Sequence, residues 1–168
     1  RASGMEPTCI VPAGDVCGEA ATWDAAANRI YWTDINRFLL HSHDPDSGAT
    51  RTHMFDQPVV ALSLTDKKGC LLVALGSQLI LFNPEAGTRE DLAATLSGWP
   101  ELRFNDGRSD PLGAFWIGSM GNNVGPNGEG ELIFAISIGI AGERKVGKIG
   151  YRDFLANRDR SSTESENP

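Results

Sequence analysis

The sequence has little cysteine and no long apolar run. Its three cysteines, Cys9, Cys17 and Cys70, form neither a Cys-x-x-Cys pair nor a disulfide framework, which favours a reduced, cytoplasmic setting. The longest apolar run, Leu132 to Ala141, is too short to span a bilayer. The N-terminus has neither a signal-peptide core nor an initiator Met. We interpret this start as that of a fragment or a processed chain.

Positive charge is also scarce. The 168 residues include 15 basic and 22 acidic side chains, a net charge of −7. We therefore expect neither nucleic acid nor an anionic membrane as a partner, because both repel a negative protein. Residues 1–142 carry 9 basic and 17 acidic groups, whereas residues 143–168 carry 6 and 5. The C-terminal stretch therefore differs in charge balance from the acidic residues 1–142.

Glycine and proline, in contrast, are abundant. The chain has 19 glycines and 9 prolines, in short clusters between apolar runs. This arrangement predicts a turn-rich β protein rather than a helical one. The 40% hydrophobic and 22% charged fractions are ordinary for a globular domain with a buried core.

A turn followed by a strand occurs three times, at 23–33, 65–74 and 109–118, with offsets of 41 and 44 residues. Each copy has an Asp, then a Gly or Asn able to adopt positive φ, then an apolar run. An x-Pro-x-x-Gly turn at 44–51 returns at 83–90. A period of about 40–50 residues with several short strands is typical of a β-propeller blade. A β-sandwich with coincidental spacing is the competing interpretation.

The third copy begins at the position that the repeat predicts, but the repeat ends near residue 135. We therefore predict an all-β chain, with an incomplete propeller of about three blades over residues 1–134. Residues 135–168 are predicted to form a divergent segment, irregular or helical and partly disordered, either from a truncated or frameshifted reading frame or as a genuine replacement. Three blades cannot close a ring, so we expect an open face prone to self-association or aggregation.

Three segments together resemble the senescence marker protein, regucalcin and gluconolactonase family. Residues 17–24 are similar to the family's Gly-Glu-Gly-Pro-x-Trp opening. Residues 103–113 begin with Arg-Phe-Asn-Asp-Gly, and residues 115–120 are close to the family's (Phe/Trp)-x-Gly-Thr-Met strand. The resemblance covers roughly residues 9–134.

This resemblance implies a six-bladed propeller that hydrolyses sugar-acid lactones with a divalent cation, calcium or zinc, in its central channel. It matches Glu19 to a metal ligand, and Arg103 and Asn105 to substrate-binding positions. Asn123 falls where some members have a substrate-contacting Glu. The resemblance assigns the other metal ligands, an Asn and an Asp, and the general-base Asp to the second half of the propeller, outside this sequence.

The residue types suit that chemistry, because carboxylate and amide oxygens bind hard cations and a bound cation polarises a carbonyl. We expect weak or no lactonase activity from this chain alone, because the resemblance leaves most ligands outside it. The alternative is a non-enzymatic partial propeller that binds calcium or a partner protein. Taken singly, Glu19 reads as a solvated carboxylate and Asn105-Asp106-Gly107 as a turn.

Other motifs receive structural interpretations. His41 and His43 alternate along a strand, and we expect them to be exposed, since nothing nearby completes a metal site. We interpret the Trp and Phe residues, including Trp23, Trp32 and Trp116, as inter-blade core.

Residues 142–148 have the Gly-x-x-x-x-Gly-Lys spacing of a phosphate-binding loop, but Ile149 stands where a Ser or Thr is required. Nucleotide binding is therefore the least favoured hypothesis.

Overall fold

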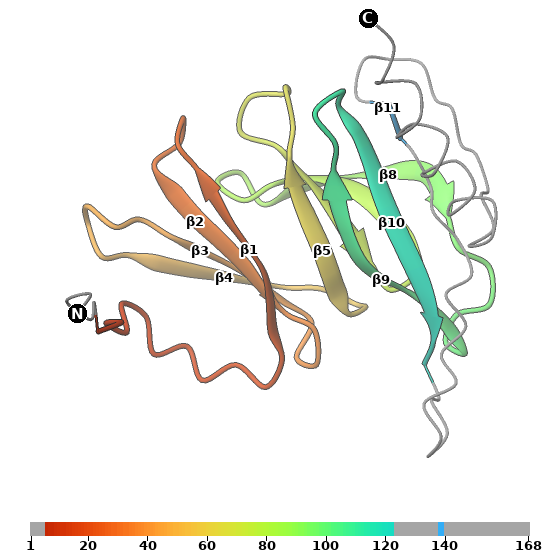
Figure 1. Cartoon of the computed structure of the whole chain (residues 1–168), viewed down its shortest axis with the longest axis horizontal. Coiled ribbons are helices and arrows are strands. Elements are labelled where there is room, and N and C mark those ends of the chain that lie inside the picture. The colour runs from red at the N-terminus through yellow and green to blue at the C-terminus, as the bar shows by residue number, and fades with distance from the viewer. Residues whose placement is uncertain (1–5, 123–137, 140–168) are drawn as a thin grey trace, which may run out of the picture.

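The computed structural model describes residues 6–122 and 138–139, and that part of the chain contains strands and no helix (Figure 1). This confirms the all-β prediction. In chain order the strands are β1 (Gly18–Asp24), β2 (Arg29–Asp34), β3 (Leu39–His43), β4 (Thr50–Met54), β5 (Val59–Leu64), β6 (Leu71–Leu75), β7 (Gln78–Asn83), β8 (Thr88–Thr95), β9 (Leu102–Ser109), β10 (Ala114–Gly121) and β11 (Ile138–Gly139).

The strands form three antiparallel sheets. Sheet A has the order β1-β2-β3-β4, sheet B the order β5-β6-β7-β8, and sheet C the order β11-β10-β9. Strands consecutive in sequence are therefore neighbours in each sheet, as the repeat predicts for successive blades. In sheet C, β11 pairs with the start of β10, where Ile138 lies opposite Phe115.

The turn residues that recur in the sequence adopt the predicted backbone conformation. Asn28, Gly69 and Gly113 precede the second strand of each sheet and have φ values of 52°, 74° and 85°. Gly48 and Gly87 end the x-Pro-x-x-Gly turns with φ values of 71° and 66°. Because left-handed φ suits Gly and, less well, Asn, these positions fix where each hairpin reverses.

Sheet B lies between the other two sheets, and its strand β8 is largely exposed, whereas β5 and β6 are buried. This explains why β6 is an uninterrupted apolar run, in which Leu71, Val73 and Leu75 face sheet A while Leu72 and Ala74 face sheet C. The cluster between sheets A and B also contains Tyr31, Leu40, Val59, Leu62, Ile80 and Phe82. The cluster between sheets B and C also contains Val60, Ala61, Leu79, Leu96, Phe104, Phe115 and Ile117.

The prediction that Trp and Phe residues fill this core is confirmed for Phe82, Phe104 and Phe115. It is wrong for Trp23, Trp32 and Trp116, since neither cluster of described residues contains a tryptophan. Trp23 is 50% exposed, on the face of sheet A opposite sheet B. That outer face also carries Met54, which is 79% exposed. Self-association through this face stays a prediction.

The expectation that His41 and His43 are exposed is also wrong. They are 4% and 5% exposed, on the same outer face of sheet A. The Nδ1 of His41 lies 2.8 Å from Thr52 Oγ1, and that of His43 lies 2.9 Å from Thr50 Oγ1. Trp32 stacks on the His41 ring at 4.9 Å between centroids. Cross-strand partners therefore bury these imidazoles, which strand alternation alone does not reveal.

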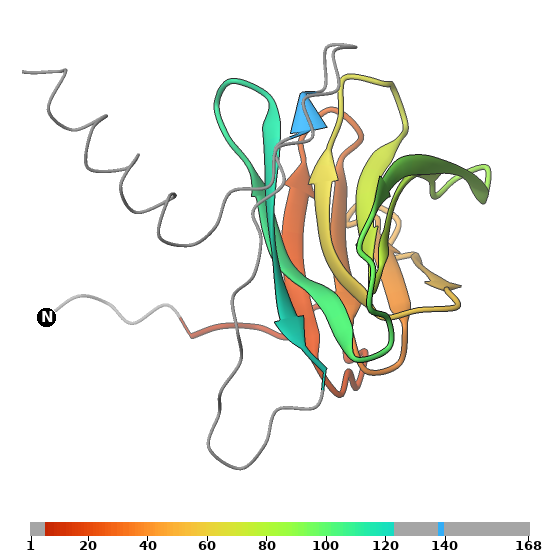
Figure 2. The ribbon, with the colours of Figure 1, turned by 90° about the vertical axis from the view of Figure 1, so that its right-hand side faces the viewer.

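The first strands of the three sheets lie side by side, with β5 in contact with both β1 and β9 (Figures 1 and 2). Each of these first strands has a register shift against the second strand of its sheet. At the shift, the first strand has one residue more than its partner. In β1, Ala20 and Ala21 lie opposite Trp32 alone, and in β9, Asn105 and Asp106 lie opposite Gly118 alone. Such bulges bend a strand and redirect its side chains.

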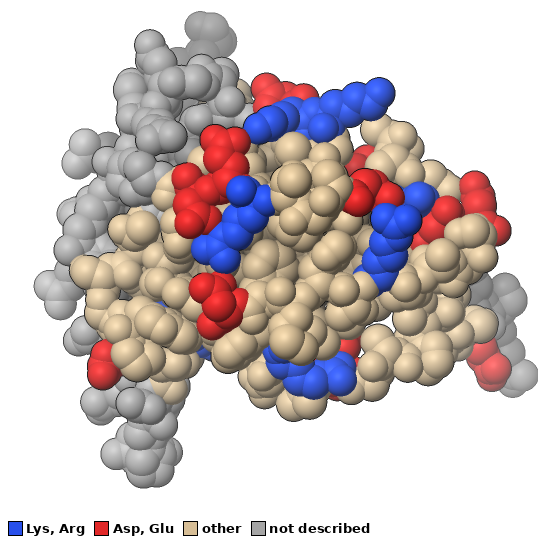
Figure 3. Space-filling model, turned by 180° about the vertical axis from the view of Figure 1, so that it is seen from behind, with Lys and Arg blue, Asp and Glu red and all other residues tan. Residues whose placement is uncertain are grey.

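Acidic and basic side chains are interspersed over the face seen in Figure 3. Ion pairs join neighbouring sheets, as in the 2.6 Å contact between Arg51 of sheet A and Glu85 in the turn between β7 and β8. The described part of the chain has no helix of the length and apolarity needed to cross a bilayer.

Candidate functional site

Glu19 lies near the start of β1 with an exposed side chain. The next residue, Ala20, has a left-handed φ of 55° and begins the bulge. Gly18, Glu19, Ala20 and Ala21 line a pocket of about 440 Å³ together with Trp32. Glu19 therefore lies directly before the bulge, with its side chain exposed.

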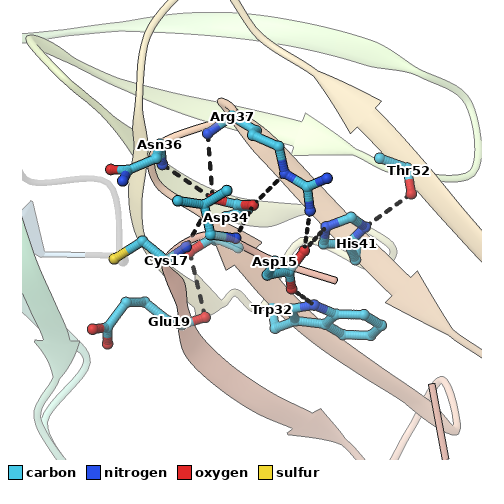
Figure 4. A network of polar contacts seen from close by, with 11 residues as sticks. Asp15, Cys17, Glu19, Trp32, Asp34, Asn36, Arg37, His41 and Thr52 are labelled. Atoms are coloured by element: carbon cyan, nitrogen blue, oxygen red, sulfur yellow. Dashed lines mark hydrogen bonds and ion pairs between the residues drawn. The ribbon is translucent and has the colours of Figure 1, made fainter. Parts of the chain in front are cut away.

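The segment that leads into Glu19 is fixed by Asp34 at the end of β2 (Figure 4). The Asp34 carboxylate accepts hydrogen bonds from the backbone N–H groups of Val16 at 2.9 Å and Cys17 at 3.2 Å. It also accepts from the backbone N–H groups of Asn36 and Arg37, and from the Arg37 guanidinium.

Burial raises the pKa of Asp34, but the hydrogen bonds from Arg37, Val16 and Cys17 outweigh it and lower the pKa to about 2. The side chain of Asp34 is 0% exposed. It is therefore an ionised carboxylate held inside the fold by donors on every side.

Asp15 provides a second attachment for the same segment. Its carboxylate accepts hydrogen bonds from Trp32 Nε1 and from the Arg37 guanidinium, both at 2.8 Å. It also lies 3.2 Å from His41 Nε2. Figure 4 shows that the Cys17 thiol and the Glu19 carboxylate point away from this network, to one common side.

Arg103 and Asn105 lie next to each other near the start of β9. Arg103 Nη1 donates to Asn105 Oδ1 at 3.1 Å and to the Phe104 carbonyl at 2.9 Å, and Arg103 Nε donates to Asn122 Oδ1 at 3.1 Å. Burial lowers the pKa of Arg103, while the nearby Cys17 raises it. Three hydrogen bonds therefore hold the guanidinium in place, and Nη2 makes none with the described residues.

Asn105-Asp106-Gly107 does not form the turn that its composition suggests when taken alone. The triplet lies inside β9, where it makes the bulge. A Cβ on Gly107 would lie 2.6 Å from Phe115 Cζ and 3.0 Å from the Trp116 carbonyl oxygen. Glycine is therefore required here by the close approach of β10, which no local pattern encodes.

The predicted site residues therefore lie on the first strands of sheets A and C, on either side of β5. Cys17, two residues before Glu19, lies within electrostatic range of Arg103. Asn123 and the 142–148 pattern lie outside the described residues. No group of three or more His, Cys, Asp or Glu side chains gathers around one point within the described ranges. The exposed Glu19 carboxylate fits a hard cation as one member of a larger ligand set.

Sequence reasoning missed Asp15, Asp34 and Asn122. Asp34 had a local signal, because an Asp that ends a strand and precedes Ile-Asn-Arg is a turn initiator. Its bonds to residues 16 and 17 span 17–18 positions and had no such signal. Asp15 and Asn122 likewise act through contacts distant in sequence.

The sequence model of the SMP-30/gluconolactonase/LRE-like region matches residues 17–148. The chain belongs to this family. It is 34% identical over 125 residues to a 6-deoxy-6-sulfogluconolactonase of Pseudomonas putida, a match covering 74% of this chain and 42% of that protein. It is 27% identical over 124 residues to regucalcin of Oryctolagus cuniculus, covering 74% of this chain and 41% of the relative.

Solved structures of this family have the same fold. A calcium-binding protein, regucalcin, from Agrobacterium tumefaciens superposes with a TM-score of 0.64 at 28% identity, over 81% of this chain and 43% of that one. A luciferin-regenerating enzyme superposes with a TM-score of 0.67 at 20% identity, over 81% and 46%. The chain thus spans about two fifths of the length of the curated relatives it matches.

Proposed function

We propose that this chain carries part of the active site of a divalent-metal-dependent hydrolase of sugar-acid lactones. In this proposal Glu19 supplies one metal ligand, and Arg103 and Asn105 bind oxygens of the lactone. Family membership and the lactonase among the relatives support the reaction class. The observation that supports the residue roles is the hydrogen-bonded Arg103–Asn105 pair near the start of β9. Glu19 lies near the start of β1, the first strand of sheet A.

Each side chain has a defined chemical task in this proposal. The two N–H groups of Arg103 Nη2 are available to donate to a ring or carbonyl oxygen of the lactone. The Asn105 amide nitrogen can donate to a sugar hydroxyl, since its Oδ1 already accepts from Arg103. A divalent cation, calcium or zinc, would polarise the lactone carbonyl when bound. The resemblance assigns the remaining ligands and the general base to residues outside this sequence.

A second candidate is a calcium-binding protein without hydrolytic activity. It is favoured by the names of two similar proteins, regucalcin and a calcium-binding regucalcin. The two candidates share the metal role of Glu19 and differ in turnover. Calcium binding without lactone hydrolysis would favour this second candidate.

The test uses the whole 168-residue chain. Calcium and zinc affinities are measured by titration calorimetry, and gluconolactone hydrolysis by acid release at constant pH. We expect Glu19→Gln to weaken metal binding by about 10-fold or more, since it removes a charged ligand. Asp46→Asn, an exposed carboxylate in the turn between β3 and β4, is the matched control and should bind as wild type.

Arg103→Ala should weaken binding of gluconolactone by about 10-fold without changing metal affinity. A Glu19→Gln variant with wild-type metal affinity would overturn the metal role. An Arg103→Ala variant that binds the lactone as wild type would overturn the substrate role.

A further inference from the structure

Asp34 does more than shape the turn that follows it. Aspartates that begin turns usually accept hydrogen bonds from backbone groups two or three residues ahead, and Asp34 does so with Asn36 and Arg37. It also reaches back to Val16 and Cys17, directly before Gly18 and Glu19.

Asp110 is a turn aspartate that, unlike Asp34, does not bind a distant segment among the described residues. It precedes β10 in sheet C and also has a lowered pKa, chiefly because Trp116 donates to its carboxylate. Its partners are Leu112 N–H, Ala114 N–H and Trp116 Nε1, all at 2.9 Å and all within six positions. Among the described residues, the Asp110 carboxylate therefore bonds only within its own hairpin.

The residues that flank Asp34 hold the same segment. Thr33 Oγ1 donates to the Glu19 carbonyl at 3.3 Å, and Ile35 N–H donates to the Cys17 carbonyl at 3.0 Å. Four hydrogen bonds between residues 33–35 and residues 16–19 thus fix the backbone of the latter segment. The carboxylate of Glu19 itself makes no contact with Asp34 and points to the opposite side (Figure 4).

We propose that Asp34 is a positioning residue, which sets the direction of the Glu19 carboxylate by holding the backbone N–H groups of Val16 and Cys17. This inference rests on the proposed metal role of Glu19. Partners that orient a metal ligand commonly change metal affinity by about 10–100-fold when removed. Asp34 would act in this way through the backbone.

Asp34→Asn is the most specific perturbation. The amide oxygen can still accept from Cys17, Asn36 and Arg37 N–H groups, as Oδ1 does now. The amide nitrogen then replaces Oδ2 and faces the Val16 N–H and the Arg37 guanidinium, donor against donor. The turn and the Cys17 bond are retained, whereas the bond that holds Val16, in the segment before Glu19, is lost.

The experiment compares the whole wild-type chain with Asp34→Asn, Glu19→Gln and the matched control Asp110→Asn. Each is titrated with calcium at a temperature where circular dichroism shows the wild-type strand signal. Backbone amide NMR spectra of the metal-free proteins are recorded in parallel. We expect Asp34→Asn to weaken calcium binding about 10-fold and to shift the Gly18 and Glu19 resonances. Asp110→Asn should lower the melting temperature while changing neither.

The outcomes separate the two proposals. Wild-type calcium affinity in Asp34→Asn, with loss of binding in Glu19→Gln, overturns the positioning role and leaves the proposed function standing. Unchanged binding in Glu19→Gln overturns the metal role, and the Glu19 resonance then still decides whether Asp34 orients this segment.

If Asp34→Asn does not fold, amide exchange in the wild-type chain gives the answer. Val16 and Cys17 should be protected relative to the exposed Gly14. Equal exchange rates at the three positions would overturn the proposal.

Discussion

At the scale of single residues, Ala20 adopts an unfavourable backbone conformation next to the candidate metal ligand Glu19. It has a φ of 55°, a region that penalises any residue with a Cβ. The family opening that this segment resembles has Gly at the same position. The structure explains that preference, because the residue after Glu19 has a left-handed φ and begins the bulge.

Replacing Ala20 by Gly should therefore stabilise the chain. We expect Ala20→Gly to raise the free energy of unfolding by about 0.5–1 kcal/mol, since the strain of the left-handed Cβ is removed. The neighbour Ala21 lacks a positive φ, so Ala21→Gly should lower the same quantity by about 0.5–1 kcal/mol. Urea denaturation of both variants measures the difference, and equal shifts would contradict this account.

Residues whose role depends on their immediate neighbours in sequence could be predicted from the sequence. Asn28 and Gly69 predict their turns, because a turn needs a residue that tolerates positive φ at that position. Glu19, Arg103 and Asn105 could be proposed because their motifs resemble those of a family. The burial of His41 could not, since it depends on Trp32, Thr52 and Asp15 from three other segments.

At the scale of elements, the first strand of each sheet combines two functions. Its apolar residues, such as Ala20, Val60 and Phe104, pack in a core cluster between two sheets, while its bulge interrupts the ladder. In β9, Phe104 is fully buried in the core between sheets B and C, while Arg103 and Asn105 form a polar pair beside it. One strand thus anchors the core and presents polar groups, because successive side chains point to opposite faces.

Gly107 is the test of this arrangement. Gly107→Ala should lower the free energy of unfolding by about 1–3 kcal/mol, because the new Cβ would overlap the Phe115 ring. At Gly121, the end of β10, no heavy atom of the described residues lies within 4 Å of such a Cβ. Gly121→Ala should therefore change stability by less than about 0.5 kcal/mol. Thermal or urea unfolding compares them, and similar losses would rule out the packing explanation.

The hairpins could be predicted from sequence, because turn chemistry is a local signal. The bulges could not be predicted. The triplet Asn105-Asp106-Gly107 has the composition of a turn, and only the partner strand determines that it extends β9.

At the scale of the whole molecule, stability depends on joining segments that are distant in sequence. Sheet B is buried between its neighbours, whereas sheet A is attached to the N-terminal segment through Asp34 and Asp15. A fully buried carboxylate is stable here only because it accepts five hydrogen bonds. Protonation of Asp34 should weaken the fold.

The pKa of Asp34 is lowered from 3.8 to about 2 on folding. A lowered carboxylate pKa means that the stabilisation is present above the unfolded value and is lost as pH falls through the folded value. We expect about 2 kcal/mol to be lost between about pH 5 and below pH 2. Urea unfolding of wild type and Asp34→Asn across this range isolates the contribution. A pH-independent difference between them would contradict it.

The sequence by itself determined the strand-and-turn repeat, the all-β class and the family motifs, because these depend on backbone preferences and residue order within short windows. The tertiary structure decided which polar residues are buried and what holds the site. Asp34, Asp15 and Gly107 owe their roles to partners brought close by folding. Hydrogen bonds and steric contacts depend on distance in space, so their partners have no fixed spacing along the chain.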